Sequence, residues 1–140
     1  MAGLSRFREA QDRGGTYERA LDELRAGRKR SHWMWFVFPQ LAGLGRSETA
    51  RRYAIASLRE ARDYLADSVL GARLRECASA LLDCGETSAE LILGPVDALK
   101  LRSCMTLFAQ ADPKEMLFAE VLERFYAGER DGATLELLAA

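Results

Sequence analysis

The ten residues SHWMWFVFPQ, Ser31 to Gln40, decide the fold class of this chain. A short apolar run of this kind forms either a buried strand or a buried helix, and its periodicity does not distinguish the two. No other part of the chain offers a convincing partner strand, with apolar and polar residues in alternation. We therefore expect a helix that ends at or just before Pro39, because proline and the residue before it disfavour helical continuation.

Helix signals occupy both sides of this segment. Residues 16–27 combine the N-cap Thr16 and the stop Gly27 with apolar residues at i, i+3, i+4 and i+7, the spacing of one helical face. Later start signals are Ser47, Asp67, the capping box Thr87–Glu90, Pro95, Asp112 and Asp131. We expect an all-α single domain over residues 1–140 with about seven helices, at 4–11, 16–27, 31–40, 47–66, 67–83, 95–110 and 112–128, and short segments at 87–94 and 131–138.

Length and composition indicate a folded, water-soluble protein. The 140 residues suffice for one domain with its own core, and 49% hydrophobic and 29% charged residues are ordinary for globular proteins. The first residues carry charges without an apolar segment, and no apolar stretch approaches the ~18 residues of a membrane span. We therefore expect a cytoplasmic protein with neither a signal peptide nor a membrane helix.

Metal and cofactor sites are not predicted. Cys77, Cys84 and Cys104 form no CxxC pair and have no histidine partner, so we expect three free thiols. The motifs HExxH and GxSxG and the phosphate-binding P-loop are also missing, so no known catalytic motif indicates an enzyme class.

Charge is unevenly distributed along the chain. Residues 1–62 carry 13 Lys and Arg against 7 Asp and Glu, whereas residues 63–140 carry 7 against 14. Such asymmetry is typical of an anion-binding face. The alternative is that the two halves neutralise each other across the fold.

Cations and aromatic rings surround His32, the only histidine. Basic residues at positions 25, 28, 29 and 30 precede it, and Trp33 and Trp35 follow. Such a combination can hold a phosphate and stack a base, unless the basic run is a solvated turn and the aromatic residues are core. Because helical positions two apart point in opposite directions, we expect one tryptophan in the core and the other at a pocket or a partner.

The glycine-containing stretch Gly43-Leu44-Gly45-Arg46-Ser47 precedes the helix predicted over 47–66. Glycines let a backbone approach a ligand, and the free N–H groups of a helix start favour anions, with Arg46 and Arg51 adding charge. The alternative is an ordinary glycine-rich turn followed by a serine cap.

Four polar residues, Asp97, Lys100, Ser103 and Thr106, recur at every third position of an otherwise apolar predicted helix. A stripe that mixes an acid, an amine and hydroxyls is suited to a pocket wall. It is equally suited to the solvent face of the helix, with Asp97 and Lys100 as a surface pair.

Several stretches resemble a known family: Lys29 with Ser31-His32-Trp33-Met34-Trp35-Phe36-x-Phe38-Pro39-Gln40, Gly43-Leu44-Gly45-x-Ser47, and Gly94-x-x-Asp97-x-x-Lys100-Leu101-x-Ser103-x-Met105-Thr106-Leu107-Phe108. They closely resemble the bacterial domain-of-unknown-function family 1810, some members of which carry the label calpastatin, in our view wrongly. The resemblance implies an all-helical single domain and supplies no activity. A weaker similarity, over one stretch, links the chain to the NADAR-type glycosidases, which act on ADP-ribose-like N-glycosidic bonds, although their Trp-Gly segment is missing after Asp97.

The leading hypothesis is a site for an anionic, phosphate-bearing and nucleotide-like small molecule, with N-glycosidic hydrolysis as a conceivable activity. Candidate catalytic residues are His32, Asp97 and Lys100, and candidate ligand-binding residues are Trp33, Trp35, Gln40, Gly43, Gly45, Arg46, Ser47, Arg51, Ser103 and Thr106. The alternatives are a non-enzymatic module that docks an acidic partner and a homodimer with an aromatic interface. The sequence is compatible with a monomer as well as with a homodimer. No sequence-specific nucleic-acid binding is expected.

Overall fold

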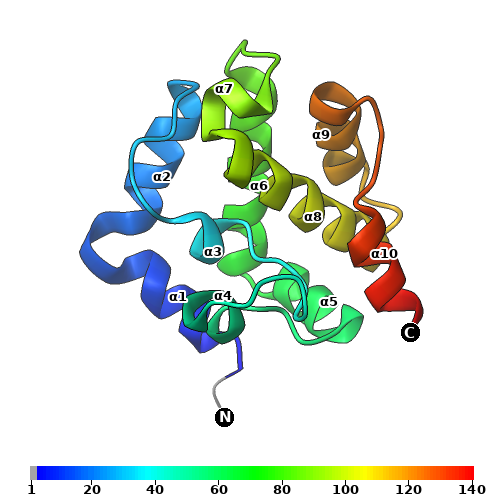
Figure 1. Cartoon of the computed structure of the whole chain (residues 1–140). Coiled ribbons are helices and arrows are strands. Elements are labelled where there is room, and N and C mark those ends of the chain that lie inside the picture. The colour runs from blue at the N-terminus through cyan, green and yellow to red at the C-terminus, as the bar shows by residue number, and fades with distance from the viewer. Residues whose placement is uncertain (1–2) are drawn as a thin grey trace.

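Helix α8 (Pro95–Ala111) runs through the middle of the fold (Figure 1). It contacts α5 (Leu58–Ala66), α7 (Ala89–Leu93), α9 (Met116–Tyr126) and α10 (Gly132–Ala139). Most of its second half is buried, because neighbouring helices cover it on several sides. A helix enclosed in this way can be apolar over nearly its whole surface, which explains its sequence.

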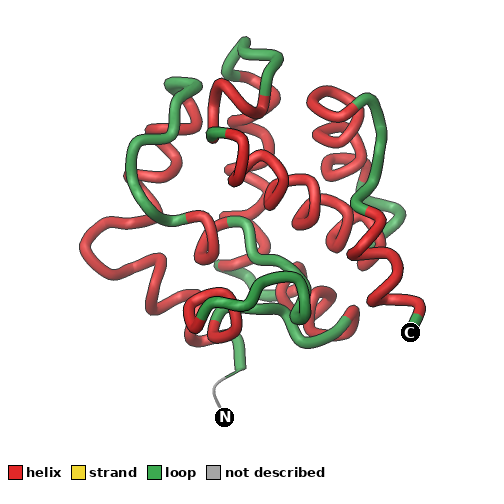
Figure 2. The backbone as a smooth tube through the Cα atoms, viewed as in Figure 1, coloured by secondary structure: helices red, strands yellow, loops and turns green. Residues whose placement is uncertain are grey.

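The computed structural model describes residues 3–140, and within that range it contains helices but no strand. The remaining helical elements are α1 (Ser5–Asp12), the short 3-10 helix η1 (Arg13–Gly15), α2 (Thr16–Arg25), α3 (Met34–Val37), α4 (Glu48–Arg52) and α6 (Leu70–Asp83). Loops of varied length join them (Figure 2). The all-α prediction is confirmed, with more helices than the seven or so expected.

The prediction of a single helix over residues 47–66 is wrong. The chain forms α4, then an extended segment around Ile55, and then α5 with Ser57 as its N-cap. The fully buried Ile55 pairs in parallel with Leu41, and its N–H donates to the Gln40 carbonyl at 2.8 Å. Hydrogen bonds across the fold thus replace the helical ones, a tertiary effect that helical periodicity does not contain.

The segment Ser31–Gln40 is helical only over α3, because its first residues are bound to Glu23 on α2. The Glu23 carboxylate accepts hydrogen bonds from the N–H groups of Arg30 and Ser31, from the Ser31 hydroxyl at 2.6 Å and from the Trp33 indole at 2.9 Å. Burial opposes the charged form, but these hydrogen bonds outweigh it and lower the Glu23 pKa to about 2.

Four predicted helix starts are displaced by one to four residues. Gly15, rather than Thr16, is the N-cap of α2, and the Thr16 hydroxyl donates to the Arg13 carbonyl instead of capping the helix. Ser88, rather than Thr87, caps α7 by accepting a hydrogen bond from the Leu91 N–H. Asp112 accepts from the Lys114 N–H in a turn, so that α9 begins at Met116. Asp67 does accept from the N–H groups at the start of α6, but regular helix begins only at Leu70. Such side-chain turns compete with helix formation at the same residue types.

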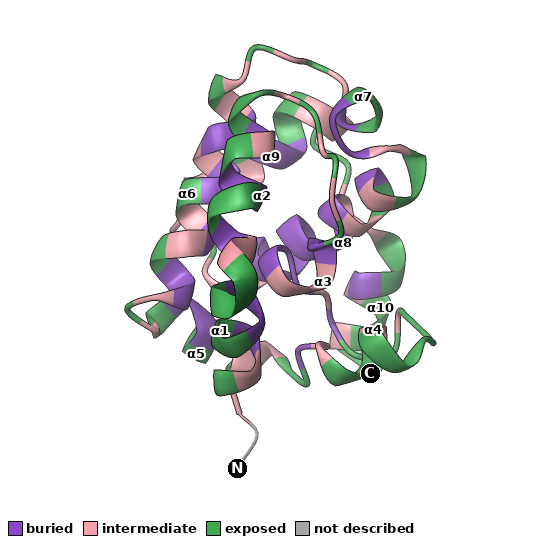
Figure 3. Cartoon of the chain, turned by 90° about the vertical axis from the view of Figure 1, so that its left-hand side faces the viewer, coloured by how far each residue is buried: buried purple, intermediate pink, exposed green. Residues whose placement is uncertain are grey.

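The core lies between α1, α2, α5, α6, α8 and α9, whose inward faces are buried (Figure 3). Its largest fully buried side chains include Trp33, Tyr64, Phe7, Phe108 and Phe118. Tyr64 links two aromatic neighbours, with ring centroids 5.4 Å from both Phe7 and Phe108. The aromatic residues of α1, α5, α8 and α9 therefore form one continuous cluster.

The cysteines are free, with Cys77 and Cys104 buried and Cys84 half-buried. Burial raises the pKa of the Cys77 thiol to about 12 and that of Cys104 well above its ordinary value. Among residues 3–140, His, Cys, Asp and Glu side chains form no group of three that could hold a metal ion. Over the same residues, every helix is too short or too polar to span a bilayer.

Candidate functional site

A cavity of about 550 Å³ lies between the loop over residues 40–47 with α4 on one side and α8 with the start of α10 on the other. Its lining includes seven residues that the sequence singled out: Trp35, Gln40, Gly45, Arg46, Ser47, Lys100 and Ser103. The first turns of α8 thus meet the segment over residues 35–47, although some 60 residues separate the two in the sequence.

The secondary structure explains why these side chains meet. Helix α8 turns Val96, Leu99, Lys100 and Ser103 toward the cavity, at the spacing of one helical face. The opposite wall is the loop that the bridge to Ile55 holds in place. The backbone pairing that interrupts the predicted long helix therefore also forms one side of the cavity.

Lys100 belongs to a cluster of charged and aromatic side chains. Its Nζ lies 4.0 Å from the centroid of the Trp35 ring and 3.4 Å from Asp97 Oδ1. Asp97 Oδ2 in turn lies 3.0 Å from Nζ of Lys29, whose ammonium is 5.2 Å from the centroid of the Trp33 ring. One carboxylate is thus shared by two ammonium groups, and the cluster carries one net positive charge beside the cavity.

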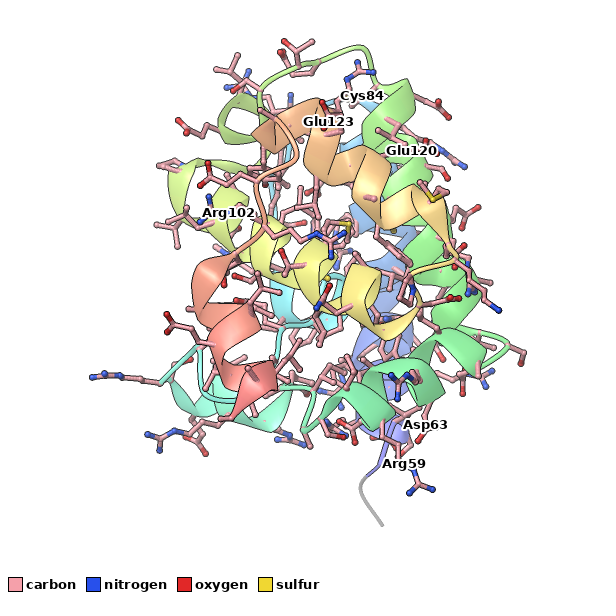
Figure 4. The ribbon with its side chains drawn as sticks, turned by 90° about the vertical axis from the view of Figure 1, so that its right-hand side faces the viewer. Arg59, Asp63, Cys84, Arg102, Glu120 and Glu123 are labelled. Carbon is pink, nitrogen blue, oxygen red and sulfur yellow. The ribbon has the colours of Figure 1, made fainter. Side chains whose placement is uncertain are left out.

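Arg102 and Asp131 form the other charged part of the wall. Arg102 projects from α8 toward the loop after α9, where its Nη2 lies 3.5 Å from Asp131 Oδ1 and its Nη1 3.2 Å from Glu129 Oε1 (Figure 4). The Asp131 carboxylate caps α10 by accepting from the N–H and hydroxyl of Thr134. Burial opposes its ionisation, but hydrogen bonds from Thr134 and Ser103 and the charge of Arg102 hold the Asp131 pKa below its ordinary value.

The family described as "Protein of unknown function (DUF1810)" matches residues 1–138. The chain belongs to the DUF1810 family. A similar solved structure is that of the conserved hypothetical protein Rv1873 from Mycobacterium tuberculosis, with 50% sequence identity and a TM-score of 0.94 over 98% of this chain and 96% of the other. No curated protein matches the chain.

In this DUF1810 protein, six of the singled-out residues lie outside the cavity lining. His32 is exposed on the surface. Trp33 is only 1% exposed and donates its indole N–H to Glu23, whereas Trp35 is half-buried at the cavity. The two tryptophans therefore separate as predicted, although Trp33 precedes α3 and is not part of the helix. Arg51 faces a different depression, which it lines together with Arg52.

The other three outside the lining are placed close behind it. Asp97 contacts Lys100 from the side of Lys29 rather than from the cavity. Thr106 is fully buried, and its hydroxyl donates to the Arg102 carbonyl and accepts from the Asp131 N–H. Gly43 has a φ of 102°, which favours glycine and gives this residue a conformational role.

The helix start after Ser47, where the sequence predicts an anion site, belongs to a helix much shorter than expected. In this DUF1810 chain the helix that begins there, α4, has only 5 residues, and the Ser47 hydroxyl already accepts from the Ala50 N–H at 3.0 Å. Ser47 and Arg46 still line the cavity, but positive charge must come from side chains rather than from a long helix dipole.

Sequence reasoning missed several lining residues of the DUF1810 cavity, above all Arg102, Asp131 and Tyr53. Asp131 was recognised only as a helix cap, which it is. The signal for Arg102 was its position beside Ser103 on the polar side of α8. Tyr53 belongs to the family resemblance, but helical periodicity did not place it at a site, because it lies between α4 and the extended segment that the sequence did not predict.

The basic first half and the acidic second half of the chain neutralise each other only in part. Some charges do neutralise each other across the halves, as in Arg25–Glu76 and Lys29–Asp97. By contrast, Arg46 and Arg51 are exposed and form no ion pair within the described residues. Positive charge therefore remains near the cavity.

Proposed function

We propose that the protein binds a phosphate-bearing, nucleotide-like small molecule in the cavity between the 40–47 loop and α8. A volume of about 550 Å³ falls within the roughly 300–1,000 Å³ typical of small-molecule sites. The wall combines three cations, Arg46, Lys100 and Arg102, with one carboxylate, Asp131. When the paired residues Lys29, Asp97 and Glu129 are included, four cations face three carboxylates, and the remaining charge of +1 favours an anion.

The position of Lys100 against Trp35 carries the proposal. An ammonium 4.0 Å from the centroid of an indole, at the wall of a cavity, can donate a charge-assisted hydrogen bond to a phosphate oxygen. The apolar side chains Val96 and Leu99, which are 64% and 61% exposed, lie on the same wall and offer a surface for a flat ring. Charged and flat parts of one ligand thus find separate partners.

The proposal is for binding rather than for N-glycosidic hydrolysis. Hydrolysis of a glycosidic bond needs a carboxyl group free to exchange a proton or to stabilise the reacting carbon. The oxygens of Asp131 are occupied by Thr134 and Arg102, and Asp97 is held between two lysines. We therefore assign no catalytic role to either carboxylate.

Thermal-shift measurements with matched compounds test the proposal: AMP against adenosine, FMN against riboflavin, and in addition ADP-ribose, NAD and inorganic phosphate. A compound present at a hundred times its Kd stabilises the fold by about 2.7 kcal/mol, which is visible as a higher Tm. We expect shifts with phosphorylated members that decrease as salt is added. Equal shifts with both members of each pair, or none with any phosphate compound, would overturn the proposal.

Two lysine variants provide the matched comparison. Lys100→Met removes the ammonium at the cavity and leaves Asp97 paired with Lys29. Lys114→Met removes the same charge from an exposed turn before α9. We expect the first variant to lose the phosphate-dependent shift and the second to keep it. Loss in both variants would point to overall charge rather than to a site.

Self-association is the second candidate function, because Val96 and Leu99 expose apolar surface side by side on α8. The occupant of that surface would then be a second copy of the chain. Light scattering after size-exclusion chromatography distinguishes the two functions. A dimer at micromolar concentration that Leu99→Asp dissociates would favour self-association, whereas a monomer would leave the cavity as the functional site.

A further inference from the structure

We infer that Lys29, which does not line the cavity, sets the charge that Lys100 presents to a ligand and so makes the site selective for phosphate-bearing over uncharged compounds. The inference rests on the proposed function and assigns a residue that acts on that site through another one. Lys29 is thus a positioning residue, and its partner Asp97 transmits the effect.

The geometry of the shared carboxylate supports this role. The side chains of Lys29, Asp97 and Lys100 are only 10%, 18% and 22% exposed, so water screens their interaction poorly. Asp97 lies nearer to Lys29, at 3.0 Å, than to Lys100, at 3.4 Å. The carboxylate is therefore engaged mainly by the lysine that is remote from the cavity, and Lys100 keeps positive charge for a ligand.

Lys29 is well placed to hold Asp97 in this way. Its backbone N–H donates to the Ile92 carbonyl at 2.7 Å, and this hydrogen bond ties the chain just before Ser31 to the end of α7. Its ammonium also lies beside the buried Trp33 ring. Backbone and side chain are thus fixed independently, and replacing the side chain leaves the backbone contact in place.

Removing Lys29 should redirect the carboxylate. In Lys29→Met, Lys100 is the only cationic partner left to Asp97 among residues 3–140, so the pair becomes neutral beside the cavity. A phosphate would then have to compete with Asp97 for Lys100. A purely structural role of Lys29, as a link between the loop and α8, predicts instead a loss of stability that no change at Asp97 repairs.

Isothermal titration with AMP and adenosine on four variants separates these accounts: Lys29→Met, Lys29→Arg, the double variant Lys29→Met/Asp97→Asn, and Arg28→Met as a control. Arg28 is an exposed neighbour whose loss changes the net charge equally. We expect Lys29→Met to bind AMP roughly tenfold more weakly, which corresponds to 1.4 kcal/mol. Lys29→Arg and Arg28→Met should stay close to wild type.

The double variant is the decisive measurement. Without the Asp97 charge, Lys100 is again free to meet a phosphate, so AMP affinity should recover to within about threefold of wild type, although two residues have changed. An equal or greater loss in the double variant would overturn the inference, as would unchanged AMP affinity in Lys29→Met. If the wild type itself binds AMP no better than adenosine, the proposed function fails and the inference falls with it.

Discussion

The ammonium of Lys100 lies 4.0 Å from the centroid of the Trp35 ring, whereas Trp33, two residues earlier, is enclosed in the core. Trp35 lies on the short helix α3, whereas Trp33 precedes that helix with a non-helical backbone, and its indole N–H is held by Glu23 at 2.9 Å. One indole therefore stabilises the fold, and the other belongs to the candidate site.

Collisional quenching by acrylamide should distinguish the two tryptophans. In Trp33→Phe the remaining Trp35 lies at the cavity and should be quenched readily, whereas in Trp35→Phe the remaining Trp33, 1% exposed, should be protected. Stern–Volmer plots at neutral pH give both constants. Equal and strong protection of both residues in a monomeric sample would contradict the placement of Trp35.

Acid should weaken the contact between α2 and the segment 30–33 through Glu23. Its pKa falls from an ordinary 4.5 to about 2 in the fold, so the native state binds the proton less well than the unfolded chain. The resulting stabilisation is complete above pH 4.5 and is lost as pH falls toward 2. We expect about 1–2 kcal/mol, after allowance for solvent screening.

Urea unfolding of wild type and Glu23→Gln across this pH range measures that contribution. Above pH 4.5 the variant should be less stable by the amount given, and the two free energies should converge as the pH decreases toward 2. A constant difference at all pH values would show that the charge of Glu23 is not what stabilises the contact.

Ser57 should be required for the start of α5. Its hydroxyl accepts from the Glu60 N–H at 3.1 Å immediately after the extended segment that interrupts the predicted helix. Ser57→Ala is expected to lower the free energy of unfolding by about 1 kcal/mol, the usual value of an N-cap. Ser68→Ala provides the control, since Ser68 is exposed and caps no helix. Equal stability of the two variants would argue against a cap at Ser57.

The thiols should react in an order set by burial. Cys77 and Cys104 are fully buried, and burial raises their pKa, so little nucleophilic thiolate exists at neutral pH. Cys84 is half-buried near the surface and should react first with Ellman's reagent. The native protein should release about one equivalent quickly and the rest only in denaturant. Rapid reaction of three equivalents would show that Cys77 and Cys104 are accessible in the native protein, which would contradict their burial.

Local sequence patterns are sufficient to predict the all-α class and most of the helices. Apolar spacing, the stop Gly27 and the N-terminal Pro95 act within one or two helical turns, so local pattern suffices to predict α2 and α8, although Thr16 does not cap α2. The same holds for Asp131, predicted as a cap and found at the start of α10. The predicted divergence of Trp33 and Trp35 is also found, although a hydrogen bond from Trp33 to Glu23, rather than helical geometry alone, places the first ring.

Contacts between distant chain segments determine where the helix predicted over 47–66 is interrupted and which polar residues lie together. Ile55 leaves the helix because its backbone pairs with residues 40–42, a contact between chain segments that no local pattern encodes. The same kind of contact puts Arg102 and Tyr53 on the cavity wall and Asp97 between two lysines. Burial and charge pairing depend on distances across the fold, and a sequence specifies those distances only once the helices have packed.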